Sequence, residues 1–340
     1  MKTKKPSAAS QPPLYKFTPK TATRLFLGTM AIATLPLLPT GSRADDAPAP
    51  APAPAPPPSR TDALVNMEFS NEYLTPRGMI VHNAGLDFEN LVLGFFNLYK
   101  SDSFINDVTV IPGVWNDFSS DGVSINPPYG SSPKTHWVEI DPIAGVSVGF
   151  AKHFKLDVTY TAFNMQILDI GTSQHLDTKL EFDDSSYLKA FALHPYFEYW
   201  QELVNKATAA DVPYLVDPLD KHLGSGPGPS YYFEVGAAPS YTFQNIGLKF
   251  ELPCRVLLPN KNFYGEYYGS SSTVGLYEVG VKASLPLKFV PQGYGHWNCH
   301  VGFRYMNLVD KNLQDMQEFN APEKSVSDTV QVYAGITAFF

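Results

Sequence analysis

Histidine and cysteine are the side chains here with the most versatile chemistry, and the chain has eight histidines and two cysteines. His296 and His300 lie four positions apart, a spacing that on a helix places two metal ligands on one face. Their segment instead alternates apolar and polar residues, and on an extended strand the two rings would lie roughly 13 Å apart. We therefore expect no metal site and no cofactor in the chain.

The two cysteines, Cys254 and Cys299, are too few for a disulfide scaffold or a cysteine-based metal site. Both fall on the apolar face of alternating segments, near opposite ends of two predicted strands that are not neighbours. A disulfide needs a Cα separation of about 4.4–6.8 Å, which this placement does not allow. The sequence predicts two free thiols.

Single charged residues recur on the polar face of the same alternating segments. If these segments are strands that close into a barrel, such charges would line its lumen, where a charged ring biases which ions pass. Acids outnumber bases on this face, which predicts a mild preference for cations; alternatively, the charges pair across strands and fill the lumen. The candidate lumen-facing residues are Glu139, Asp141, Asp157, Lys179, Glu198, Glu234, Lys249, Glu251, Arg255, Glu278, Lys282, His300 and Arg304.

Long alternating strands must position these charges. In the last segment Val330, Ile336 and Phe340 share one face, while Gln331 and Thr337 share the other. Strands of soluble sheets usually have about 5 or 6 residues, whereas a tilted membrane strand needs about 9–11. Segments of the longer kind are predicted at 63–74, 89–99, 106–118, 136–150, 154–166, 175–183, 188–201, 229–242, 245–258, 273–287, 296–308 and 328–340.

A soluble β-sandwich also alternates in this way, so composition has to separate the two folds. Aromatic residues make up 14% of the chain and charged residues only 17%, against roughly 25% charged in soluble domains. The polar face is rich in Gly and Ser, and aromatic residues gather at strand ends, as in membrane-interface girdles. We predict an all-β fold, a closed antiparallel transmembrane β-barrel of about twelve strands over residues 62–340.

The connections between predicted strands alternate in length, as in outer-membrane barrels. With both ends of the barrel chain on the periplasmic side, the short turns lie inside and the long loops near 119–135, 202–228, 259–272 and 309–327 lie outside. The aromatic residues fit this topology. Trp137, Tyr199, Trp200 and Tyr231 fall at the outer rim, and Phe150, Phe243, Trp297 and Phe340 at the inner rim.

The N-terminal region is predicted to direct export. Basic residues precede the apolar run Leu25–Leu38, and Ser42 and Ala44 supply the small residues of a cleavage site, so residues 1–44 have the layout of a signal peptide. The alternative, a membrane anchor, needs a span of roughly 20 apolar residues. Residues 45–61 are rich in Ala and Pro and predict a semi-rigid periplasmic linker that could contact peptidoglycan.

Two segments resemble known families. The chain ends in Phe340 after apolar residues at every second position, which resembles the C-terminal signature of bacterial outer-membrane barrel proteins. That resemblance implies that Phe340 belongs to a signal for the barrel-assembly machinery. The stretch Ser70–Gly78 is similar to the S-x-Y-x-x-R-G opening of porins of the TorF type, with an additional residue before Arg77 and Gly78.

Three function classes follow from a barrel in the outer membrane of a Gram-negative-type bacterium, surrounded by lipid and lipopolysaccharide. The first is a porin or channel for passive diffusion of small solutes or ions. The second is a sealed structural or adhesive barrel. The net charge of −8 argues against nucleic acid as a partner.

The third class is a barrel lipase or protease. Outer-membrane phospholipases place a Ser two residues from a His. In this chain none of the eight histidines is followed by Ser at that spacing. The residues two positions after them are Ala84, Val138, Lys155, Asp177, Tyr196, Gly224, Asn298 and Gly302. We therefore expect no enzymatic activity.

Overall fold

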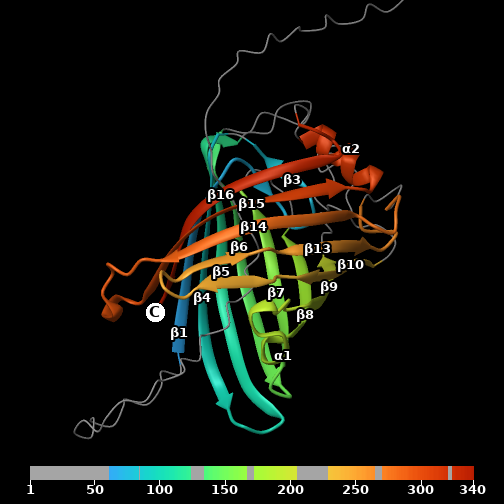
Figure 1. Cartoon of the computed structure of the whole chain (residues 1–340). Helices are drawn as coiled ribbons and strands as arrows, with labels where there is room; N and C mark the ends of the chain where they lie inside the picture. The colour runs from blue at the N-terminus through green and yellow to red at the C-terminus, as the bar shows by residue number, and fades with distance from the viewer. Residues whose placement is uncertain are drawn as a thin grey trace, which may run out of the picture.

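A computed structural model describes residues 61–83, 85–123, 134–166, 172–204, 229–264, 270–320 and 324–340 (Figure 1). The predicted signal peptide, residues 45–60 of the predicted linker and most of the loop 202–228 lie outside this part of the chain. None of the described helices has the length and apolar character needed to cross a bilayer.

The strands that form the wall of the fold follow one another around a single sheet. They are β1 (Thr61–Ser70), β4 (Asp87–Lys100), β5 (Ile105–Val123), β6 (Thr135–Phe150), β7 (Phe154–Met165), β8 (Ser173–Phe182), β9 (Tyr196–Val204), β10 (Ser230–Ala237), β11 (Ser240–Phe243), β12 (Leu248–Glu251), β13 (Cys254–Pro259), β14 (Leu276–Pro286), β15 (His296–Leu308) and β16 (Asp328–Phe339).

Two wall strands are interrupted by proline, so the fourteen segments of the described sheet make twelve wall strands. β10 and β11 form one wall strand that is interrupted at Pro239, and β12 and β13 form another that is interrupted at Pro253. Proline has no N–H to donate to the ladder. Both carbonyls still accept bonds, from Leu252 N at 2.9 Å and from Gly280 N at 2.8 Å. The wall therefore continues past each proline.

The first and last wall strands close the sheet into a barrel. β1 and β16 are antiparallel, with Leu64 opposite Phe339 and Ser70 opposite Tyr333. Beyond β16, Phe340 N donates to Ala63 O at 3.0 Å. The predicted closed antiparallel β-barrel of twelve strands is confirmed for the described residues.

The barrel has two different ends. Thr61, Phe340 and the connections 101–104, 151–153, 183–195, 244–247 and 287–295 share one end, called here the turn end. The connection 183–195 contains α1 (Ser185–Leu188) and η1 (Lys189–Phe191), and 287–295 contains η2 (Gln292–Tyr294). The opposite end, called the loop end, holds the described parts of the connections 71–86, 260–275 and 309–327, the last with α2 (Lys311–Asn320) (Figure 1).

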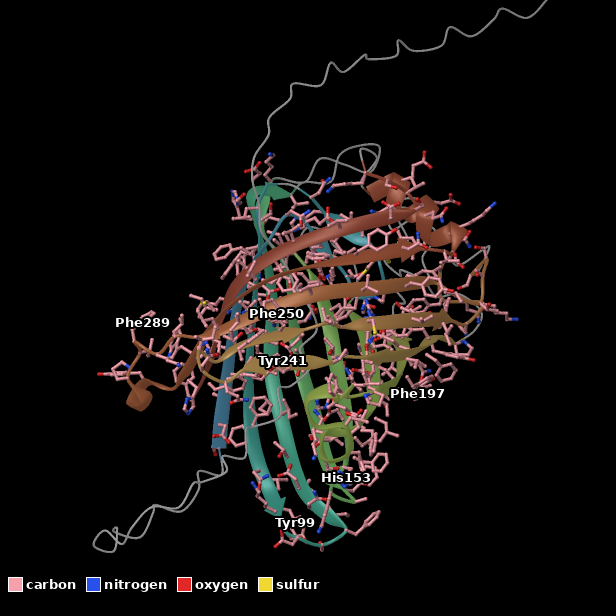
Figure 2. All side chains as sticks on the ribbon, in the orientation of Figure 1. Tyr99, His153, Phe197, Tyr241, Phe250 and Phe289 are labelled. Carbon is pink, nitrogen blue, oxygen red and sulfur yellow. The ribbon has the colours of Figure 1, made fainter. Side chains whose placement is uncertain are left out.

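The two faces of the wall have the predicted polarity. Gln331 is fully buried while Ile336 on the same strand is 36% exposed. Figure 2 shows Phe197, Tyr241 and Phe250 on the outside of the wall, where each is at least 37% exposed. Both cysteines are free, as predicted.

Three details of the prediction were wrong. The first strand ends at Ser70 instead of residue 74, because the chain then turns into the lumen and forms a hairpin, β2 (Tyr73–Leu74) and β3 (Ile80–His82). β9 begins at Tyr196 rather than residue 188, since α1 and η1 occupy the preceding residues. Trp200 does not join the outer girdle: it faces inward and is only 5% exposed.

Candidate functional site

The predicted lumen charges on β10, β13 and β14 form one ion-paired group. Arg255 contacts Glu234 through Nη1, and its Nε and Nη2 donate to Glu278 Oε2 at 2.9 and 2.6 Å. Tyr196 Oη adds a bond of 2.6 Å to Glu234 Oε1. All three charged side chains are at most 10% exposed, so each charge depends on its partners for stabilisation.

A second row of charges crosses β7, β8 and β9 beside this group. Asp157 lies opposite Lys179, and Lys179 lies opposite Glu198. The Lys179 ammonium sits 3.8 Å from the centroid of the Tyr196 ring, a cation–π contact. Tyr232 Oη donates to Glu198 Oε1 at 3.2 Å.

Nearer the turn end, the lumen charges are partly exposed. Lys249 Nζ lies 2.7 Å from Glu251 Oε1, and these side chains are 31% and 19% exposed. Lys282 stands directly opposite Glu251 in the ladder. Lys155 and Asp157 form a pair at 2.9 Å with 26% and 14% exposure. Water therefore reaches this half of the lumen.

His300 and Arg304 face inward from β15. His300 Nε2 contacts Glu68, while its Nδ1 lies 3.5 Å from Thr337 Oγ1. The order carboxylate, imidazole and hydroxyl resembles a catalytic triad, but 3.5 Å exceeds the usual reach of about 2.6–3.2 Å. Thr337 Oγ1 instead donates to Asn66 Oδ1 at 2.6 Å. This group is therefore better explained as lumen packing.

Glu139 and Asp141 on β6 lie near the loop end and are 1% and 4% exposed. Tyr73 Oη of the hairpin donates to Glu139 Oε2 at 2.9 Å. Asp141 Oδ1 accepts from Asn164 N at 3.2 Å. Here the carboxylates are held by neutral donors, in contrast to the Arg255 group.

The inner hairpin, defined here as residues 71–83, is the feature that the sequence did not predict. The wall and loops hold it by its main-chain oxygens. Arg304 Nη2 donates to Leu74 O at 2.6 Å and Arg255 Nη2 to Pro76 O at 2.5 Å. Gln331 Nε2 donates to Glu72 O at 2.7 Å. Two predicted lumen residues, Arg255 and Arg304, thus fix the hairpin rather than stand free in a channel.

The connection between β13 and β14 supplies a fourth bond, from Tyr264 Oη to Arg77 O at 2.8 Å. Burial and the nearby Asp310 carboxylate raise the pKa of Tyr264, which keeps the phenol protonated as a donor.

The turn of the hairpin contains the Arg77-Gly78 pair of the TorF-like stretch. The Arg77 guanidinium lies 4.9 Å from the Phe163 ring centroid and 4.8 Å from that of Trp200. Gly78 has φ of +89°, and a Cβ there would lie 2.8 Å from the Leu276 side chain. Sterics therefore explain a glycine at position 78, because the turn is left-handed there and is buried against the wall.

Apolar side chains complete the closure of the loop end. One buried cluster joins the hairpin, the wall strands β9, β10, β13, β14 and β15, the described part of the connection 260–275, and α2. Its members are Leu74, Met79, Ile80, Trp200, Tyr232, Leu257, Phe263, Tyr264, Leu276, Met306, Leu308 and Leu313, each at most 8% exposed. The sequence signal for the inner hairpin was weak: the alternation stops after Ser70, and Pro76-Arg77-Gly78 marks a turn.

No protein-family model and no curated protein matches this sequence. Among solved structures, the beta domain of the Bordetella autotransporter BrkA is similar, at 8% identity and a TM-score of 0.37, over 82% of this chain and 99% of that one. Outer membrane phospholipase A from Escherichia coli has 11% identity and a TM-score of 0.37, with 83% and 93% covered. OprB from Pseudomonas putida has 8% identity and a TM-score of 0.35, with 82% and 93% covered. At these values the likeness concerns the fold alone.

Proposed function

We propose that this protein is an outer-membrane channel for small solutes or ions that the inner hairpin holds closed at the loop end. The membrane assignment rests on the outward face of the wall. Val92, Val146, Val235, Val279 and Val301, from strands around the barrel, are each at least 37% exposed. Burying such a belt in lipid is favourable, whereas water would solvate it poorly.

The observation that carries the channel proposal is the contrast between the two halves of the lumen. Toward the turn end the wall carries partly exposed charges such as Lys249, Glu251 and Lys155. Toward the loop end a separate segment, and not the wall alone, fills the space. A closure made by a separate segment can be displaced while the wall remains intact.

The direction of ion selectivity follows from which charges are paired. Arg255 is shared by Glu234 and Glu278, whereas Glu139 and Asp141 have neutral hydrogen-bond donors. The opened lumen would therefore be negative and favour cations. A reversal potential measured across a KCl gradient would test this sign.

Planar-bilayer conductance tests the channel. The chain is compared with a variant in which residues 71–83 are replaced by a short Gly-Ser link. The variant should show large steady steps, and the unchanged chain should show rare openings of the same size. A matched control shortens the connection 287–295 at the turn end, which leaves the hairpin contacts intact. Heat-dependent gel mobility and a β-type circular dichroism spectrum establish that each variant has folded.

The second candidate is a sealed structural barrel, which the four main-chain anchors and the buried Arg77 favour. A seal made by the hairpin predicts steps from the hairpin-replaced variant but none from the unchanged chain at any voltage. Absence of steps from a folded hairpin-replaced variant would contradict the channel and favour the sealed barrel, because the wall itself would then close the lumen.

A further inference from the structure

Three ionisable side chains from three elements meet where the inner hairpin returns to the wall. His82 ends β3, Asp87 begins β4 and Asp117 lies on β5. His82 Nε2 is 2.9 Å from Asp117 Oδ2 and 3.6 Å from Asp87 Oδ1. One nitrogen or oxygen from each residue lies within 4.8 Å of those from the other two.

These groups are buried but incompletely bonded. Asp117, Asp87 and His82 are 0%, 1% and 5% exposed. Neither oxygen of Asp87 accepts a hydrogen bond from the described residues, and Asp117 Oδ1 accepts none either. His82 presents a single nitrogen, Nε2, to two carboxylates. Buried carboxylates without a partner are costly, so a bound proton or a bound metal cation would stabilise this arrangement.

Two further buried carboxyl groups lie beside these three side chains. Glu89 on β4 and Glu139 on β6 both lie opposite Asp117 in the ladder, and they are 4% and 1% exposed. Among the described residues, the ion-pair partner of Asp87 and Asp117 is His82 alone.

We propose that His82, Asp87 and Asp117 bind a divalent transition-metal cation, with Zn²⁺ the best match. Imidazole nitrogen and carboxylate oxygen are both Zn²⁺ ligands, and a tetrahedral site places its donors about 3.3 Å apart. The two separations at His82 Nε2, 2.9 and 3.6 Å, lie on either side of that value. Three protein ligands leave a fourth position for water.

The metal would tie the inner hairpin to the wall, because His82 belongs to the hairpin and both carboxylates belong to wall strands. Metal binding would thereby stabilise the attachment of the hairpin to the wall. This goes beyond the proposed channel and does not require that the lumen ever conducts.

The test is calorimetric titration of Zn²⁺ into the folded full-length chain in detergent micelles, after dialysis against a chelator. One equivalent should bind to the unchanged chain. D87N, D117N and H82Q should bind at least about tenfold more weakly, the loss seen even for outer-shell partners of a metal. D157N is the matched control: it removes a lumen carboxylate that is paired with Lys155, and its Zn²⁺ binding should be unchanged.

Two further readouts separate a metal from a protonated His82 that serves as the cation. Zn²⁺ should raise the urea midpoint of the unchanged chain but not that of D87N. It should also slow amide hydrogen exchange over residues 80–82. If the folded chain binds no stoichiometric Zn²⁺, or if D87N binds it equally well, the proposal is overturned. Because neither readout measures conductance, this outcome is independent of the channel test.

Discussion

At the scale of single residues, the structure separates buried from partly exposed ion pairs in the lumen. Arg255 joins two wall carboxylates and the main chain of the hairpin, whereas Lys249 and Glu251 form a partly exposed pair. Ion pairs of these two kinds differ in cost when one partner is removed, because only the buried group leaves charges that water cannot reach.

Replacing Arg255 with Gln should therefore destabilise the barrel by about 3–5 kcal/mol, since Glu234 and Glu278 lose their counter-charge. Urea unfolding in lipid vesicles measures this difference. The control K249Q should cost less than about 1 kcal/mol, the usual size for an exposed pair. Equal costs for the two variants would show that water also reaches Arg255.

Asp184 at the turn end gives a pH prediction. Burial raises the pKa of its carboxyl, but bonds from Leu193 N and His194 N at 2.9 and 3.0 Å outweigh this and hold the pKa below its usual value. A lowered folded-state pKa stabilises the fold above the unfolded-state pKa of about 3.9, and this contribution disappears as the pH falls through the folded-state pKa.

The protection factors of the amides of residues 185–194, which compare their exchange with that of an unstructured chain at the same pH, should consequently fall below about pH 4. In D184N, these protection factors should already be lower at neutral pH, and their fall at low pH should be smaller. An unchanged pH profile in D184N would assign the effect to another group.

At the scale of elements, period-two alternation was enough to predict the wall strands. Each wall strand presents one face to the lumen and one to the outside, so every second residue reports the same environment. Strand ends were predicted less well where a local alternative competes, as at α1 and η1 before β9.

The inner hairpin could not be predicted in the same way, because what holds it is distant in sequence. Pro76 and Arg255 are 179 positions apart, and Glu72 and Gln331 are 259 apart. Alternation reports burial along one strand and carries no information about such partners. For the same reason the sequence placed Arg255 and Arg304 on the lumen face but did not reveal that they bind a segment within it.

Close contact between strands gives a prediction at this scale. Gly302 lies opposite Tyr333, and a Cβ on it would be 2.3 Å from Val281 O in the neighbouring strand. G302A should destabilise the barrel by about 1–3 kcal/mol through overpacking, measured as a lower urea midpoint. The matched control is G293A at the turn end, where a Cβ would meet nothing within 4 Å. A neutral G302A would mean that β14 and β15 can separate slightly without loss.

At the scale of the whole molecule, the barrel closes between its first and last wall strands. The Phe340 main chain bonds to Ala63, while its side chain is 54% exposed and contacts Trp297 edge-on with ring centroids 5.9 Å apart. The side chain is therefore accessible from outside, and the main chain serves closure.

Replacing Phe340 with Ser separates these two roles. Folding into lipid vesicles should change by less than about 1 kcal/mol, as is usual for surface positions. The amount of barrel assembled in the outer membrane of cells should fall if Phe340 is part of an assembly signal. F289S is the control, since Phe289 is 80% exposed at the same end of the barrel (Figure 2). A similar loss in both variants would point to general aromatic anchoring.

The way the inner hairpin is held has a consequence for evolution. Leu74, Pro76 and Arg77 accept hydrogen bonds through their main-chain oxygens, which every amino acid possesses. Substitutions at many hairpin positions would leave those hydrogen bonds intact, whereas the donors Arg255, Arg304 and Tyr264 have few chemical substitutes. In diverged relatives we expect the three donor residues to be retained even where the hairpin sequence has changed completely.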